Sequence, residues 1–129
     1  MTAQEFRSAV ERGDHEAAAD LLAEDVTFHS PIVHRIYRGR AAVAPVLAAV
    51  VTVFEDFRYT AEYVSAGGSD SGGSDGAVLA FSCRVGDRDL DGVDILRFGA
   101  DGKIVEFTVM VRPYSAATAL RERMAALLA

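Results

Sequence analysis

The stretch LDGVDILRFGADGKIVEFTVMVR, residues 90–112, decides the fold class of this chain. Successive side chains of a strand point to opposite faces of its sheet, and both halves of the stretch alternate in this way around the turn-forming GADGK, residues 99–103. The pattern predicts two antiparallel strands. Asp94 shares a face with Leu96 and Phe98 of the first strand. An unpaired charge is costly inside a protein, so Asp94 needs a partner, a proton or a pocket.

The segments before this hairpin continue the same pattern. FRYTAEYVS (57–65) and AVLAFSCRV (77–85) also alternate with period two, and Gly86 and Asp87 suit a tight turn into the hairpin. Between them, GGSDSGGSD (67–75) repeats Gly-Gly-Ser-Asp. We interpret it as a flexible hairpin tip, because the glutamate that usually closes a calcium loop is missing. The sequence therefore predicts a long antiparallel meander.

Helix signals precede the meander. Thr2 is followed by Glu5 at capping-box spacing, and Gly13 is expected to end that first helix. Asp14 can cap a second helix, which we expect to run through Leu22.

A short strand over residues 25–30 and a loop up to Gly39 are expected next, followed by an apolar helix over 41–54. Pro45 must lie in or just past the first turn of that helix, since it would otherwise kink it. Ser115 can cap a final helix, whose apolar stripe comprises Leu120, Met124, Leu127 and Leu128. This order of elements predicts an α+β fold, a curved antiparallel sheet with helices on its inner face.

The composition limits the classes of partner. The chain has 129 residues, 50% hydrophobic and 25% charged, which fits a single domain over residues 1–129. The net charge of −6 without a basic cluster argues against nucleic acids and anionic membranes. One cysteine, Cys83, excludes an intramolecular disulfide. The N-terminal residues carry no apolar signal core and the most apolar run is too short to span a bilayer, so we expect a cytoplasmic protein.

Three segments resemble a known superfamily. They are ERGDHEAAADLLAEDVTFHSP (11–31), YRGRAAV (37–43) and GVDILRFGADGKIVEFTVMVRP (92–113). They resemble the nuclear transport factor 2-like superfamily, in particular its SnoaL-like branch, which is related to ketosteroid isomerase. The resemblance implies a cystatin-like, cone-shaped α+β barrel with a pocket between the sheet and the helices, and commonly a dimer. It does not imply one function, since the fold hosts isomerases, cyclases, dehydratases, hydrolases and binding proteins.

The resemblance to ketosteroid isomerase can be followed at three positions. Asp94, in its D-x-x-R-F context, matches the aspartic acid of the isomerase's oxyanion hole, a carboxyl kept protonated by an apolar site. Ser30 stands where the isomerase has its general-base aspartate, and Phe6 where it has a hydrogen-bonding tyrosine. Two of the three chemical groups are therefore missing. We reject steroid isomerisation by that mechanism.

Asp94 and His34 are the candidate catalytic residues. An aspartic acid that faces an apolar pocket can donate a hydrogen bond when neutral or act as a base when ionised. The alternative for Asp94 is a structural acid bonded to a backbone amide, a tyrosine or an arginine. His34 lies in the loop expected to rim the pocket, while strand alternation points His29 away from it. We expect neither a metal site nor a cofactor.

The candidate ligand-binding residues share an expected inward position. Tyr59 and Tyr63 fall on the same strand face as Phe57, and Ser30 is the polar residue before a proline. Each of these side chains has core packing or loop formation as its alternative role. The full set is Phe28, Ser30, Phe54, Tyr59, Tyr63, Phe81, Phe107 and Val109. Cys83 has no basic neighbour in the sequence, and we interpret it as a core residue.

Three functions remain open from the sequence. The first is an enzyme of the isomerase, cyclase or dehydratase type that acts on a small, largely apolar molecule through Asp94. The second is a non-catalytic module that binds such a molecule, and the third is a dimeric interaction protein. The outward sheet face suits a homodimer contact, because it mixes apolar with charged and polar residues. Its members are Val93, Ile95, Met110, Arg97, Glu106, Thr108 and Arg112.

Overall fold

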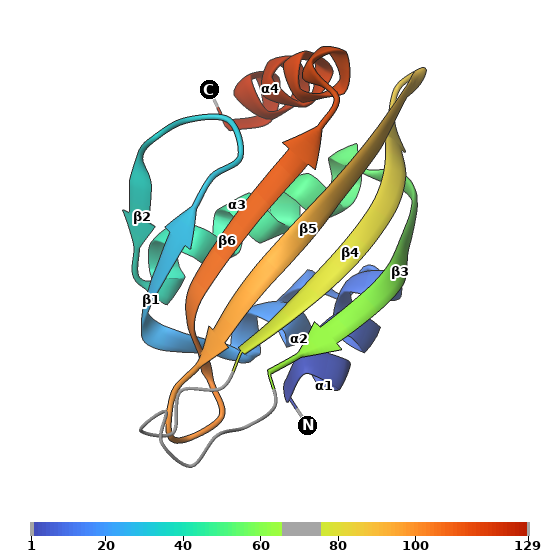
Figure 1. The fold of residues 1–129 in the computed structure, drawn as a ribbon. Coiled ribbons are helices and arrows are strands. Elements are labelled where there is room, and N and C mark those ends of the chain that lie inside the picture. Colours follow the sequence, from blue (N-terminus) through green and yellow to red (C-terminus); the bar gives the residue numbers. More distant parts are fainter. Residues whose placement is uncertain (1, 66–75, 129) are drawn as a thin grey trace.

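The computed structural model describes residues 2–65 and 76–128, which form four helices and one six-stranded sheet (Figure 1). The strands lie in the order β2-β1-β6-β5-β4-β3 across the sheet. In chain order the elements are α1 (Thr2–Glu11), α2 (His15–Asp20), β1 (Leu22–His29), β2 (Ile36–Arg38), α3 (Arg40–Val53), β3 (Glu55–Val64), β4 (Gly76–Val85), β5 (Arg88–Phe98), β6 (Ile104–Arg112) and α4 (Tyr114–Leu128).

The sheet confirms the α+β prediction but is mixed. Strands β3 to β6 form the predicted antiparallel meander. Strand β1 pairs with β6 in parallel, so the expectation of a wholly antiparallel sheet is wrong. We expected Leu22 at the end of a helix, and this prediction is wrong. Leu22 is the first residue of β1, where it pairs with Ile104 of β6 and is fully buried. Strand β2 was not predicted, since three residues are too few to show an alternation.

Helices α1, α2 and α3 lie on one side of the sheet, which we call its inner face, and α4 lies across one end (Figure 1). Asp14 caps α2 as predicted, by accepting a hydrogen bond from the amide of Ala17 at 3.0 Å. Pro45 lies inside α3, just past its first turn. Ser115 lies within α4 and does not precede it, so its prediction as the cap is wrong. Leu127 is 54% exposed, so its place in the predicted stripe of α4 is wrong. The side chain of Leu128 lies outside the described ones.

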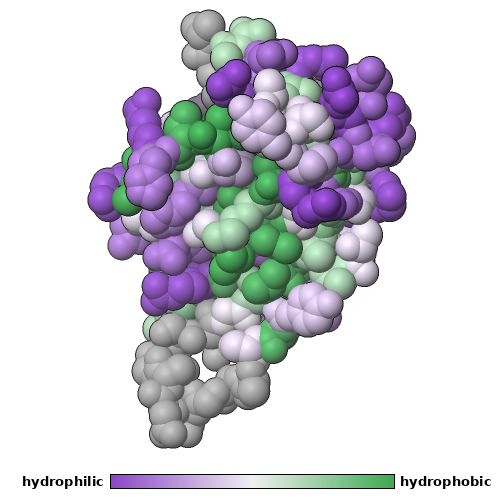
Figure 2. Space-filling view, turned by 45° about the horizontal axis from the view of Figure 1, so that its top comes forward, coloured by the Kyte–Doolittle hydropathy of each residue, from purple (hydrophilic) through white to green (hydrophobic). Residues whose placement is uncertain are grey.

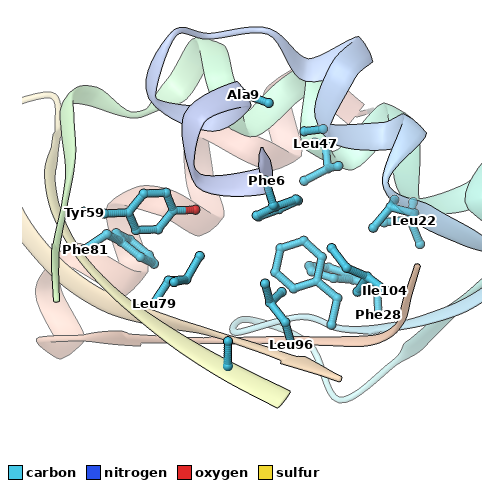
Figure 3. Close-up of a cluster of buried hydrophobic side chains, with 14 of the residues drawn as sticks. Phe6, Ala9, Leu22, Phe28, Leu47, Tyr59, Leu79, Phe81, Leu96 and Ile104 are labelled. Carbon is cyan, nitrogen blue, oxygen red and sulfur yellow. The ribbon is translucent and has the colours of Figure 1, made fainter. Parts of the chain in front are cut away.

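The hydrophobic core lies between the inner face and the helices (Figure 3). Its largest fully buried side chains come from α1, α4 and the strands β1, β4, β5 and β6. Full burial of one such side chain stabilises the fold by roughly 1.5–3 kcal/mol. Members of the core are Phe6, Leu22, Leu79, Phe81, Leu90, Leu96, Ile104 and Leu120.

The other side of the sheet, its outer face, carries apolar side chains that no helix or strand of residues 2–65 and 76–128 covers. Figure 2 shows hydrophobic residues gathered along the middle of the visible face, bordered by hydrophilic ones. Met110 is 56% exposed and Tyr63 65%. The pairing of the strands places the outer side chains in two adjacent rows. The first row consists of Tyr63, Val78, Ile95 and Thr108, and the second consists of Ala80, Val93 and Met110.

The hairpin tip expected at 67–75 lies outside the described residues. Within residues 2–65 and 76–128, no helix combines the length and the apolar character needed to cross a membrane.

Candidate functional site

A cavity of about 580 Å³ lies between the inner face of the sheet and the helices. Both this volume and the predominantly apolar lining are typical of sites that bind small molecules. Six of the eight predicted ligand-binding residues line it: Phe28, Ser30, Phe54, Tyr59, Phe107 and Val109. Further apolar lining residues are Phe6, Val10, Val46, Leu47, Val50, Phe57, Leu120 and Met124.

Asp94 is the one buried charged residue in the described part of the chain, at 6% exposure, and its side chain contributes to the cavity lining. Strand alternation directs it inward, where its cross-strand neighbours are Leu79 and Val109. Burial raises the pKa of the Asp94 carboxyl to about 7, and a hydrogen bond from Tyr59 acts in the opposite direction. At neutral pH both the protonated and the ionised forms of Asp94 are therefore populated.

Tyr59 is the polar partner of Asp94. Its hydroxyl donates a hydrogen bond of 2.6 Å to Oδ2 of Asp94, and its ring is 5% exposed. Burial, and next the charge of Asp94, raise the pKa of Tyr59 well above its ordinary value, so the hydroxyl keeps its proton and remains a donor. The backbone amide of Tyr59 donates to the Glu11 carboxylate at 3.4 Å, which ties β3 to α1.

An irregularity in β3 separates Tyr63 from Tyr59. Tyr59 pairs with Phe81, but the next pair is Ala61 with Ala80, so β3 contains one extra residue at this point. An extra residue reverses the alternation of all residues that follow it. Tyr63 therefore points to the outer face, and the prediction that it faces the pocket is wrong. Glu62 points inward in its place and pairs with Arg7 of α1 at 3.6 Å.

Phe81 lies behind the cavity lining, and its prediction as a lining residue is wrong. Its ring centroid lies 5.0 Å from that of Phe57, 5.7 Å from that of Phe54 and 6.2 Å from that of Tyr59. Figure 3 shows the rings of Tyr59 and Phe81 side by side, with the Tyr59 hydroxyl directed toward the middle of the core. Phe81 thus supports three residues that line the cavity.

The histidines are distributed differently from the prediction. His34 is exposed and lies outside the cavity lining, so the expectation that it rims the pocket is wrong. His29 is half-buried and also lies outside the lining, as the strand alternation predicted. His15, which the sequence did not single out, lines the cavity. Its place depends on how α2 packs against α3, and no local pattern in the sequence indicates that.

Ser30 and Phe6 line the cavity but offer little acid–base chemistry. The hydroxyl oxygen of Ser30 accepts hydrogen bonds from the amides of Ile32 at 3.0 Å and Val33 at 3.3 Å, so it shapes the turn after β1. Phe6 is fully buried, with its ring edge against Phe107 at 5.4 Å between centroids. The Asp94–Tyr59 pair is the polar centre of the inner cavity wall.

Two further predictions concern cysteine and metals. Cys83 is buried in the core as predicted, and burial raises the pKa of its thiol to about 12. Over residues 2–65 and 76–128, no three His, Cys, Asp or Glu side chains are grouped so that they could hold a metal ion.

Known structures share this architecture. A steroid delta-isomerase from Pseudomonas aeruginosa is 43% identical, with a TM-score of 0.86 over 98% of this chain and 88% of the isomerase. An uncharacterised protein with a cystatin-like fold from Silicibacter pomeroyi is 37% identical, with a TM-score of 0.84 over 97% of this chain and 83% of that protein. A putative ketosteroid isomerase from Kribbella flavida, 24% identical over 87% of this chain and 76% of its own, shares the fold with a TM-score of 0.65.

Among proteins with curated descriptions, none matches this sequence. The model of the SnoaL-like domain matches residues 3–107, which include Asp94, Tyr59 and most of the cavity lining. The match covers most of the chain and agrees with the fold and with the cystatin-like and isomerase structures. The chain belongs to the SnoaL-like domain family.

Proposed function

We propose that this protein binds a small, largely apolar molecule in the cavity and exchanges a hydrogen bond or a proton with it through Asp94. The observation that carries the proposal is the Asp94–Tyr59 pair, a buried carboxyl with a 2.6 Å hydrogen bond at the wall of an apolar cavity. Such a carboxyl has lost its hydration. A polar atom of a ligand can therefore restore part of the lost hydrogen bonding, while the apolar wall accepts the rest of the molecule.

The pKa of Asp94, about 7, suits one group acting as both base and acid. The ionised form removes a proton next to a carbonyl group of the ligand, and the same carboxyl then returns that proton to another atom. Tyr59 donates to Oδ2 throughout, so Oδ1 is the oxygen that exchanges protons with the ligand. When the proton returns to another carbon of the ligand, the two transfers are an isomerisation. When it returns to a hydroxyl group that leaves as water while the C–O bond breaks, they are a dehydration. When the carbanion first attacks a second carbonyl carbon and the proton goes to the oxygen of that carbonyl, they are a cyclisation.

The isomerase from Pseudomonas aeruginosa supports this class of chemistry, because it shares 43% of its residues with this chain. Steroid isomerisation by the mechanism of ketosteroid isomerase remains rejected, since Phe6 carries no hydroxyl. Ser30 stands at the position of the general base of ketosteroid isomerase, and its hydroxyl oxygen already accepts hydrogen bonds from two backbone amides. The same facts favour a second candidate, a binding protein in which Asp94 only orients the ligand.

The affinity of a neutral ketone tests the proposal. We expect 2-acetonaphthone to bind roughly tenfold more tightly at pH 5.5 than at pH 8.5, because only protonated Asp94 can donate a hydrogen bond to the ketone oxygen. Asp94→Asn should remove this pH dependence, since an amide donates at both pH values. Isothermal titration calorimetry measures the affinities, with naphthalene as the ligand without an acceptor. Equal affinity for the ketone at both pH values in the wild-type protein would contradict the proposal.

We further propose that two copies associate through their outer faces. The rows that contain Ile95 and Met110 form an apolar strip, and its borders carry the ion pairs Arg97–Glu106 at 3.5 Å and Arg112–Asp91 at 3.2 Å. An apolar centre with a polar rim is typical of protein interfaces, and the same patch on both copies suits a two-fold axis.

Light scattering tests this dimer. At micromolar concentration we expect a mass twice the 13.8 kDa of one chain, and Ile95→Glu should reduce it to that of the monomer, because a carboxylate would lie in the apolar centre. Arg121→Glu, on α4, is the matched control and should leave the dimer intact. A wild-type protein that is monomeric under these conditions would remove the claim.

A further inference from the structure

Charged side chains enter the cavity lining at two places away from Asp94. The end of α1 and the turn after it contribute Glu11 and Arg12, and α4 contributes Arg121. All three are exposed, so they lie where the cavity meets solvent. We call them the charged rim.

Two members of the charged rim already have partners. Glu11 pairs with Arg7 at 3.5 Å and accepts the Tyr59 amide at 3.4 Å. Arg12 donates to the Ser8 hydroxyl at 3.1 Å and pairs with Asp14 at 3.5 Å. These contacts leave the guanidinium of Arg121 as the uncommitted charge of the rim.

The side chain of Arg121 makes neither a hydrogen bond nor an ion pair with any side chain or backbone atom of residues 2–65 and 76–128. Its position is nonetheless fixed, because the preceding Leu120 is 2% exposed and Met124, one turn later, packs against the core. Both neighbours also line the cavity. The backbone of α4 therefore holds an unpaired guanidinium at the cavity edge, in a chain whose net charge is −6.

From this arrangement we infer that the ligand is amphipathic, with a neutral oxygen that faces Asp94, an apolar body, and a carboxylate that pairs with Arg121 at the rim. The inference rests on the proposed function of the cavity. A guanidinium binds a carboxylate through two parallel hydrogen bonds, which gives this end of the ligand its orientation. The reverse orientation is disfavoured, because it would bury the carboxylate beside the Asp94 carboxyl in an apolar wall.

The test uses 6-acetylnaphthalenes that carry an acid chain of one, three or five carbons at position 2, each compared with its primary amide. The three chain lengths vary the separation between the ketone oxygen and the carboxylate, so that one ligand can reach Asp94 and Arg121 at the same time. At pH 6 the acids are ionised while most of Asp94 is protonated. Each acid and its amide therefore differ by one negative charge at the end of the chain, and calorimetry measures the effect of that charge on the affinity. We expect at least one acid to bind the wild-type protein roughly tenfold more tightly than its amide.

Substitutions identify the residue responsible for this preference. Arg121→Gln should bring the acid-to-amide ratio to about one, and Arg121→Lys should retain part of the preference. Arg123→Gln is the matched control, because it removes the same charge from an exposed position of α4 outside the cavity lining. It should leave the ratio unchanged.

The outcomes separate this inference from the proposed function. If the amides bind but no acid binds more tightly than its amide, or if the preference survives Arg121→Gln, the carboxylate inference is overturned while the cavity keeps its proposed role. If neither amides nor acids bind, the proposed function is overturned together with it.

Discussion

Between pH 4 and pH 7, the free energy of unfolding of the wild-type protein should fall relative to that of Asp94→Asn by on the order of 4 kcal/mol. The pKa of Asp94 is about 7 in the folded protein, compared with the ordinary value of 3.8 in the unfolded chain. Between these values the folded state binds more protons than the unfolded state, so stability decreases as pH rises. The contribution is fully present below pH 4 and is lost above pH 7. Urea unfolding of both proteins at a series of pH values measures the difference.

Tyr59→Phe provides the control for this pH dependence. The hydrogen bond from Tyr59 lowers the pKa of Asp94, against the effect of burial. Its removal should therefore raise the folded-state pKa and extend the decrease in stability to higher pH. Parallel stability curves for wild type and Asp94→Asn across the whole range would show that the Asp94 pKa is not raised.

Phe81→Ala should lower the free energy of unfolding by about 3–5 kcal/mol, the usual cost of truncating a buried phenylalanine. The ring is 2% exposed and contacts the rings of Phe54, Phe57 and Tyr59. Its loss leaves a void behind the cavity wall, and thermal or urea unfolding measures the effect.

Gly92 gives a second probe of the same packing. A Cβ atom at Gly92 would overlap the Phe81 ring and lie 2.7 Å from the Met110 carbonyl oxygen. Gly92→Ala should therefore destabilise the wild-type protein by about 1–3 kcal/mol. It should cost less in the Phe81→Ala background, where the ring no longer occupies the space. Strictly additive effects of the two substitutions would contradict this packing.

The sequence predicted those parts of the fold whose residues carry a local pattern. The alternation around Asp94 placed its carboxyl on the inner face, because β5 is regular from Asp91 to Arg97 in its pairing with both neighbours. The same reasoning failed for Tyr63, since one extra residue in β3 reverses the alternation and leaves no mark in the composition of the strand. The parallel pairing of β1 with β6 joins segments far apart in the chain, and no local pattern indicates it.

The candidate site was predictable to a similar degree. Asp94 and the lining residues Phe28, Tyr59 and Phe107 lie on strands, where alternation applies. The hydrogen bond between Tyr59 and Asp94 joins residues 35 positions apart and depends on the register of β3, β4 and β5. Arg121 and His15 reach the cavity through the packing of α4 and α2 against α3, which tertiary contacts decide.

A ¹³C NMR titration of the Asp94 side-chain carboxyl, assigned with Asp94→Asn, tests the central claim most directly. In the free protein the account predicts a pKa of about 7. Saturation with 2-acetonaphthone should raise that pKa further, because the ketone binds the protonated carboxyl more tightly than the ionised one. A pKa near the ordinary aspartate value, or a raised pKa that the ketone leaves unchanged, would contradict the role of Asp94 in ligand binding.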